Sequence, residues 1–180
     1  MREEIIFAGF GGQGIILSGT IVCLAAMREG KQVTHIPSYG AEMRGGTANC
    51  SVVVSDQEIA SPLVPYPSVC VVMNQPSLAK FEPRVREGGL LLYNSSLIDG
   101  QPSRKDIRCI PVPANELAEK EGSVRSANMI MLGLLVRLKP EIAALESVEA
   151  ALEGAVSARN RSLNRINRSC LARGYSLNGA

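Results

Sequence analysis

Short apolar runs separated by polar turns dominate the first part of the chain. Runs of about four to eight such residues, bounded by glycine or proline, are typical of buried strands. Pro111 interrupts the final run, which indicates an edge strand because proline has no amide hydrogen to donate to a ladder. The runs predict strands over residues 4–10, 31–36, 48–55, 69–74, 90–93 and 107–112.

Helical spacing of apolar residues alternates with these runs and then takes over. Asn115 is the expected cap of a helix that follows Pro113. The segment 127–138 is apolar almost all round, so we expect it to be buried. The predicted helices cover 15–28, a start at 75–77, 116–121, 127–138, 147–156 and 161–171. This order predicts an α/β fold with a mostly parallel sheet flanked by helices and a helical C-terminal tail, in one domain over residues 1–180.

The charge of the chain does not suggest a nucleic-acid partner. The formal net charge is +2, and the basic residues form no dense tract interleaved with aromatic side chains, the usual mark of such a surface. A series near the end of the chain is spaced like the solvated side of a helix: Arg159, Arg161, Arg165, Arg168 and Arg173.

Neither a membrane span nor a secretion signal is expected. The longest apolar stretch, over 129–136, is far shorter than the ~18 residues that a membrane helix needs. The first residues lack the apolar core of a signal peptide. We therefore expect a cytoplasmic protein that does not contact a membrane.

The residues that usually carry chemistry are few and dispersed. Iron–sulfur clusters and structural zinc need several ligands at close spacing. Here the single histidine is His35, and no CxxC pair occurs among Cys23, Cys50, Cys70, Cys109 and Cys170. We expect no metal site and no catalytic residue in this chain, since a nucleophile, a base and an orienting group cannot be assembled.

A glycine-rich loop joins the first predicted strand to the first predicted helix. Gly9, Gly11 and Gly14 have the spacing G-x-G-x-x-G, and Gly12 and Gln13 complete the turn. Glycines let the backbone approach a ligand closely, and free amides at a helix N-terminus attract an anion. A phosphate or carboxylate site is one interpretation, and close helix–sheet packing without a ligand is the other.

Two features of nucleotide-binding loops are missing. The second predicted strand should end in an acidic residue that holds a ribose, but residues 33–37 read Val-Thr-His-Ile-Pro. The lysine and Ser/Thr of a nucleoside-triphosphate loop do not follow the glycines. Their absence disfavours NAD(P) and nucleoside triphosphates as ligands, and it strengthens the interpretation of close helix–sheet packing without a ligand.

A second loop, over 37–47, brings a tyrosine, a carboxylate and a guanidinium together between glycines, with a short helical turn at 41–43 as one option. It follows the end of a predicted strand, and ligands of open α/β sheets bind at the carboxyl ends of strands. One interpretation is a loop that contacts a partner or ligand, and the other is a plain surface turn. The candidate contact residues are Tyr39, Glu42, Arg44, Gly45 and Gly46.

The segments 8–15 and 38–46 together resemble the gamma subunits of 2-oxoacid:ferredoxin oxidoreductases, and the helical segment 126–138 is similar to that family as well. The resemblance covers nearly the full chain. It implies a Rossmann-like fold and a cytoplasmic assembly with alpha and beta subunits and, as an option, a ferredoxin-like delta subunit. Thiamine diphosphate, Mg²⁺ and iron–sulfur clusters would be bound by these partners, and none by this chain alone.

The resemblance also implies a reaction, the oxidative decarboxylation of a 2-oxoacid with coenzyme A to an acyl-CoA, with electrons passed to ferredoxin. The form Phe10-Gly11-Gly12 looks more like the 2-oxoglutarate and branched-chain types than the pyruvate type. The isolated chain is expected to be inactive, and a contact between two copies is an option. The alternatives are the small subunit of an indolepyruvate oxidoreductase, a nucleotide-binding protein, and a structural partner without a ligand.

Two hypotheses about sites follow from the loops and the resemblance together. The first loop would present backbone donors to a phosphate of coenzyme A, through Gly9, Gly11, Gly12, Gln13 and Gly14. The second loop would pack against the catalytic subunits, through Tyr39, Glu42, Arg44, Gly45 and Gly46.

Overall fold

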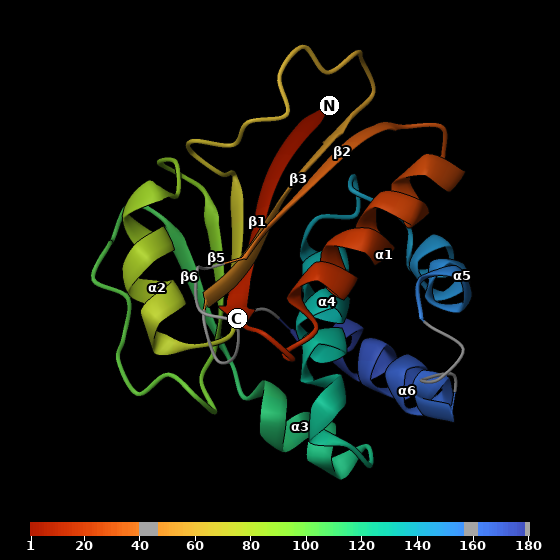
Figure 1. Cartoon of the computed structure of the whole chain (residues 1–180). Helices are drawn as coiled ribbons and strands as arrows, with labels where there is room; N and C mark the ends of the chain where they lie inside the picture. Colours follow the sequence, from red (N-terminus) through yellow and green to blue (C-terminus); the bar gives the residue numbers. More distant parts are fainter. Residues whose placement is uncertain (40–46, 157–161, 179–180) are drawn as a thin grey trace.

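The computed structural model describes residues 1–39, 47–156 and 162–178 (Figure 1). Within them, the strands of the sheet are β1 (Arg2–Phe10), β2 (Gln32–Tyr39), β3 (Thr47–Ser55), β4 (Val69–Val72), β5 (Leu90–Asn94) and β6 (Arg108–Val112). The helices are α1 (Ile15–Arg28), α2 (Gln75–Phe81), α3 (Ala114–Lys120), α4 (Ala127–Leu138), α5 (Leu145–Ala155) and α6 (Asn164–Tyr175). Two short 3₁₀ helices are η1 (Glu82–Arg84) and η2 (Val124–Ser126).

The strands follow the order β2-β3-β1-β4-β5-β6 across the sheet. β1, β4, β5 and β6 run parallel, whereas β3 is antiparallel to both of its neighbours, β1 and β2. β1 and β2 therefore run in the same direction, and α1 forms the crossover connection between them. β3 lies between these two strands and runs in the opposite direction. The predicted α/β fold with a mostly parallel sheet is confirmed, with β3 antiparallel to both β1 and β2 at one side.

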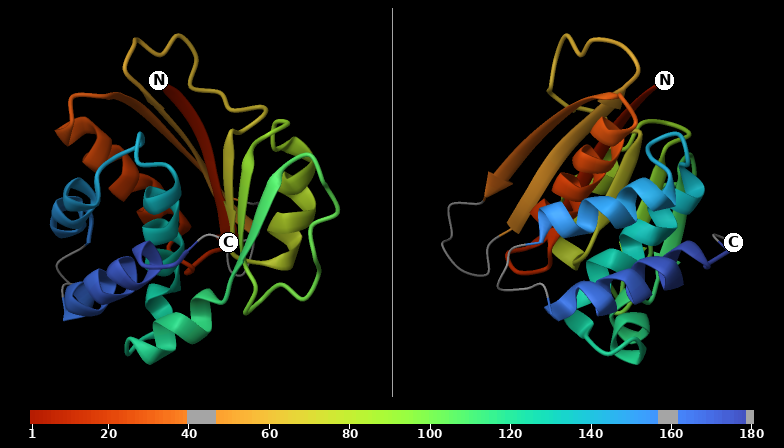
Figure 2. Two further views of the ribbon diagram at one scale, coloured as in Figure 1. Left: turned by 180° about the vertical axis from the view of Figure 1, so that it is seen from behind. Right: turned by 90° about the vertical axis from the view of Figure 1, so that its right-hand side faces the viewer.

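Helices cover both faces of the sheet (Figures 1 and 2). The larger hydrophobic core lies on the side of α1, α4, α5 and α6 and includes Phe7, while the smaller core lies on the side of α2 and includes Ile6 and Phe81. Consecutive residues of β1 thus enter opposite cores, as the alternation of side chains along a strand requires.

The predicted burial of α4 is confirmed. All residues from Ala127 to Val136 are buried. Neither α4 nor any other helix in the described ranges has the length and apolar character to cross a membrane. α6 packs directly on α4, because a Cβ added at Gly133 would lie 2.1 Å from the Leu171 carbonyl oxygen, and one added at Gly174 would lie 2.0 Å from the Ile130 carbonyl oxygen. The two helix backbones touch at these glycines.

β2 continues through Tyr39, beyond its predicted end at Ile36. The prediction of a loop from Pro37 is therefore wrong for residues 37–39. β2 is an edge strand, and an edge tolerates a residue without an amide hydrogen. The predicted helical turn at 41–43 lies outside the described residues.

The predicted cap of the helix after Pro113 is wrong. α3 begins at Ala114 with Pro113 at the N-cap position. Asn115 instead accepts a hydrogen bond from Asn94 through its Oδ1, at 2.9 Å. Oδ1 of Asn94, which is fully buried at the end of β5, accepts a hydrogen bond from the Ala114 amide at 3.2 Å. A side chain at the end of β5, rather than one next to the helix in sequence, thus accepts the hydrogen bond of the first amide of α3.

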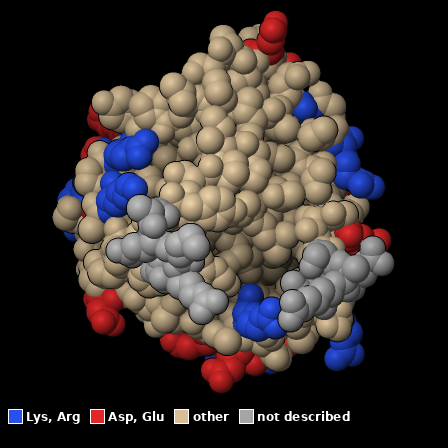
Figure 3. Space-filling view, viewed as in Figure 1, with Lys and Arg blue, Asp and Glu red and all other residues tan. Residues whose placement is uncertain are grey.

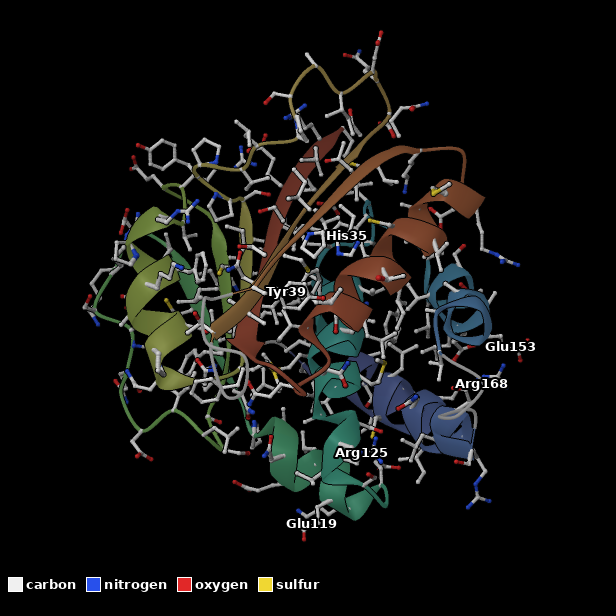
Figure 4. The ribbon with its side chains drawn as sticks, in the orientation of Figure 1. His35, Tyr39, Glu119, Arg125, Glu153 and Arg168 are labelled. Atoms are coloured by element: carbon white, nitrogen blue, oxygen red, sulfur yellow. The ribbon has the colours of Figure 1, made fainter. Side chains whose placement is uncertain are left out.

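The basic series near the end of the chain lies on the solvated side of α6, as predicted for the residues that the structure describes. Arg165, Arg168 and Arg173 are exposed. Arg168 pairs with Glu153 of α5 at 2.6 Å (Figure 4). Arg159 and Arg161 lie outside the described residues.

Candidate functional site

The glycine loop lies between β1 and α1, as predicted, and its glycines have different structural roles. Gly12 and Gly14 have φ angles of 95° and 72°, in the left-handed region that favours glycine. A Cβ at Gly14 would lie 2.3 Å from Nδ2 of Asn128, and one at Gly9 would lie 2.6 Å from Oε1 of Gln13. By contrast, a Cβ at Gly11 would meet no atom within 4 Å. The backbone conformation therefore favours glycine at positions 12 and 14, and side chains leave little room for a Cβ at Gly9, whereas Gly11 faces open space.

Gln13 holds the loop in shape. Its Oε1 accepts a hydrogen bond from the Phe10 amide at 2.7 Å, and its Nε2 donates to the Met73 carbonyl oxygen at 3.4 Å. The Gln13 amide donates to the Phe10 carbonyl oxygen at 3.2 Å. These bonds use the amides of Phe10 and Gln13. The amides of the first turn of α1 have no acceptor within the helix, so they and the other loop amides are the donors that could bind an anion.

A cleft of about 450 Å³ opens beside this loop. Figure 3 shows a hollow on this face of the molecule, with uncharged atoms around most of it and Lys or Arg side chains at its lower rim. The cleft joins the loop to segments from β2, η2, α4, α5 and α6. Its lining residues include Gly11, Gly12, Gly14, Ile16, Leu17, Tyr39, Arg125, Asn128, Val156 and Asn167.

Arg125 gives the loop end of the cleft a positive charge. No carboxylate of the described residues forms an ion pair with its guanidinium. Arg125 also lines a smaller hollow of about 200 Å³ on the other side of the loop, next to Gly12 and Gln13. The positive end of the α1 dipole lies at the same place. Since Ile16 and Val156 are apolar, the cleft fits a ligand with an anionic end and an uncharged end.

Two buried asparagines attach the loop and the cleft to the helical layer. Asn128 donates from Nδ2 to the Gly14 carbonyl oxygen at 3.1 Å and to Oγ of Ser18 at 3.3 Å. Asn167 accepts at Oδ1 from Oγ of Ser126 at 2.7 Å. Neither amide is among the site residues predicted from the sequence; for Asn128, a polar residue on the otherwise apolar segment 127–138 was the available signal.

The register of the sheet brings the two sequence motifs together. Gly9 of β1 and Tyr39 of β2 both pair with Ala48 of β3, so the glycine loop and the segment after Tyr39 leave the same end of the sheet. Tyr39 is 71% exposed and lines the cleft (Figure 4). The other predicted contact residues, Glu42, Arg44, Gly45 and Gly46, lie outside the described residues.

The cysteines are poor candidates for chemistry. Burial raises the pKa of the Cys23 and Cys50 thiols to about 12 and that of Cys170 to about 11. The pKa values of Cys70 and Cys109 are raised as well, chiefly by burial. A protonated thiol is a weak nucleophile and a weak metal ligand. Across the described ranges, no group of three His, Cys, Asp or Glu side chains could hold a metal ion.

His35 is expected to make stability depend on pH. Its Nε2 is buried without a hydrogen-bond partner in the described residues, and burial lowers its pKa from the ordinary value near 6.5. The unfolded chain then binds a proton more readily, so stability falls as pH drops below about 6.5. Denaturant unfolding at pH 7.5 and 5.5 measures this fall, and the variant His35→Asn should reduce it. A pKa at or above 6.5 in an NMR titration of this single histidine would contradict the expectation.

The chain is similar to known proteins over nearly its whole length. The family model described as pyruvate ferredoxin/flavodoxin oxidoreductase matches residues 4–177. The chain is 44% identical over 135 residues to the ketoisovalerate oxidoreductase subunit VorA of Methanothermobacter marburgensis. The match covers 75% of this chain and 28% of that longer protein. The chain is also 35% identical over 181 residues to the 2-oxoglutarate synthase subunit KorC of Methanocaldococcus jannaschii, which covers 98% of this chain and 94% of KorC.

A solved structure supports the same relation. The gamma subunit of the keto/oxoacid ferredoxin oxidoreductase from Geobacter sulfurreducens PCA superposes with a TM-score of 0.82 at 28% sequence identity. The match covers 97% of this chain and 95% of that subunit. The predicted fold class therefore agrees with the structure of a protein of similar length.

Proposed function

Because the chain belongs to the pyruvate ferredoxin/flavodoxin oxidoreductase family, we propose that it acts as the gamma subunit of a cytoplasmic 2-oxoacid:ferredoxin oxidoreductase. The assembly would oxidise a 2-oxoacid, release its carboxylate as carbon dioxide, join the acyl carbon to the sulfur of coenzyme A and pass two electrons to ferredoxin. Thiamine diphosphate with Mg²⁺ and the iron–sulfur clusters, on the partner subunits, would supply the carbanion and electron-transfer chemistry. The similarity to KorC along nearly its whole length supports 2-oxoglutarate as the substrate.

The role proposed for this chain is to hold the phosphate end of coenzyme A. The observation that carries the proposal is the cleft in which the glycine loop, the start of α1 and Arg125, which pairs with no described carboxylate, converge. Coenzyme A has phosphates at one end and an uncharged arm at the other, which matches the polarity of the cleft. Amides at a helix N-terminus and a guanidinium are groups that proteins use to bind phosphate.

The second loop is proposed to contact the catalytic alpha and beta subunits. Tyr39 is exposed at the mouth of the cleft, and an acyl group formed on another subunit must meet coenzyme A there. The same junction would include Glu42, Arg44, Gly45 and Gly46, which follow Tyr39 in the chain.

Substitution of Gly11 tests the coenzyme A proposal without disturbing the fold. The variant Gly11→Phe places a ring in open space beside the loop amides, and should raise the apparent KM for coenzyme A in the assembled enzyme about tenfold, which is ~1.4 kcal/mol. The measurement is 2-oxoacid-dependent reduction of methyl viologen at varied coenzyme A. The thermal midpoint should not change. An unaltered KM in a stable, assembled variant would show that the loop does not bind coenzyme A.

A further inference from the structure

β2 leaves one edge of the sheet open. It is the first strand of the order β2-β3-β1-β4-β5-β6 and pairs with β3 on its inner side. In the ranges that the structure describes, no strand pairs with its outer side. The outward N–H and C=O groups of such a strand can hydrogen-bond to another extended chain.

This edge has little of the usual protection against association. β2 has eight residues, QVTHIPSY, without Lys, Arg, Asp or Glu. Its side chains Ile36 and Tyr39 are 39% and 71% exposed. The opposite edge strand, β6, has five residues and begins with the exposed Arg108. Natural sheets protect an edge by charge, by a short strand or by a cover. In β2, a single proline, Pro37, provides the only device of this kind within the strand.

Among the described residues, the centre of the surface next to this edge is also uncharged. Figure 3 shows the face with β2 and α1 toward the viewer, where Lys, Arg, Asp and Glu lie at the rim and uncharged atoms form the centre. The centres of protein interfaces are depleted of charged residues and enriched in tyrosine and other aromatic side chains. This face therefore fits a partner surface that is itself uncharged.

The open edge reaches the mouth of the cleft. Tyr39 is the last residue of β2 and also lines the cleft beside the glycine loop. In the proposed function, coenzyme A bound there receives its acyl group from the subunit that carries thiamine diphosphate. That subunit must therefore approach the cleft at Tyr39, which places it beside the outer edge of β2.

We infer that an extended, uncharged segment of the thiamine-binding subunit pairs main chain to main chain with the outer edge of β2, from Gln32 to Tyr39. The inference rests on the proposed function and specifies how that partner docks. Strand addition provides hydrogen bonds from the backbone, and side chains such as Ile36 add apolar contacts. A second copy of this chain is the less favoured candidate for this edge, because it would cover Tyr39 and block access from the cleft to the catalytic subunit.

A charge on the edge tests the inference. The variant Ile36→Lys, coexpressed with tagged catalytic subunits, should bind them about tenfold more weakly than the wild type, because a lysine on an edge strand opposes pairing. The matched control is Leu63→Lys, in the loop between β3 and β4, where Leu63 is 69% exposed. The control should retain full binding. Thermal midpoints and coenzyme A binding by each variant are measured in parallel. These measurements distinguish failure of the proposed coenzyme A site from failure of the proposed strand pairing.

Hydrogen exchange gives a second measurement that needs no variant. The amides of residues 32–39 that face away from β3 should exchange at least about tenfold more slowly in the complex than in the free chain, because pairing removes them from water. Unchanged exchange together with full binding by Ile36→Lys would overturn the inference. Loss of self-association in Ile36→Lys with the catalytic subunits still bound would assign the edge to a second copy, and would overturn it as well.

Discussion

Replacement of Arg125 by alanine is expected to raise the apparent KM for coenzyme A about 10- to 100-fold in the assembled enzyme. Arg125 lines the cleft at the start of α1, and no described carboxylate neutralises its guanidinium. A hydrogen bond to a charged group contributes roughly 1.5–3 kcal/mol, which corresponds to a change of that size in affinity. The measurement is the dependence of methyl viologen reduction on coenzyme A concentration, at fixed and saturating 2-oxoacid.

A second arginine provides the matched control. Arg86 is exposed and lines a different hollow, of about 350 Å³, near the start of β5 and thus at the opposite end of the sheet. Arg86→Ala should leave the KM for coenzyme A unchanged, while Arg125→Lys should recover part of the affinity because it keeps the charge and loses the planar fork. Equal KM values for the Arg125→Ala and Arg86→Ala enzymes would remove Arg125 from the site.

The variants Gly133→Ala and Gly174→Ala are each expected to lower the free energy of unfolding by about 3 kcal/mol, the upper part of the usual range for overpacking. The new methyl groups would lie 2.1 Å from the Leu171 carbonyl oxygen and 2.0 Å from the Ile130 carbonyl oxygen. Both obstacles are backbone atoms of a facing helix, so α4 and α6 must separate to admit either methyl. Urea unfolding followed by circular dichroism measures the change.

Gly154 offers the control for this pair. It lies in α5, and the nearest atom that a Cβ there would meet is Leu24 Cδ1 at 4.0 Å. Gly154→Ala should therefore keep or raise stability, since alanine is favoured over glycine in a helix by roughly 0.5–1 kcal/mol. A loss below 1 kcal/mol for Gly133→Ala would mean that the two helices are not held in backbone contact.

The glycine loop shows how much of a site a sequence motif can predict. The spacing of Gly9, Gly11 and Gly14 after an apolar run predicted a strand, a turn and a helix, and the structure confirms all three. It did not predict which glycines are needed for the turn. Gly14 is restricted by Asn128, which lies more than a hundred residues away, and Gly11 is not restricted at all.

The sequence alone determined the α/β class, the glycine turn at the start of α1 and the burial of α4, because each depends on local conformational preferences and on apolar periodicity. The tertiary structure decided the antiparallel pairing of β3 and the extension of β2 past Pro37 to Tyr39. It also decided that Arg125, Asn128 and Asn167 line one cleft. These features depend on contacts between residues far apart in the chain. No local pattern carries that information, since the partner that satisfies each group is chosen only when the sheet and the helical layer pack together.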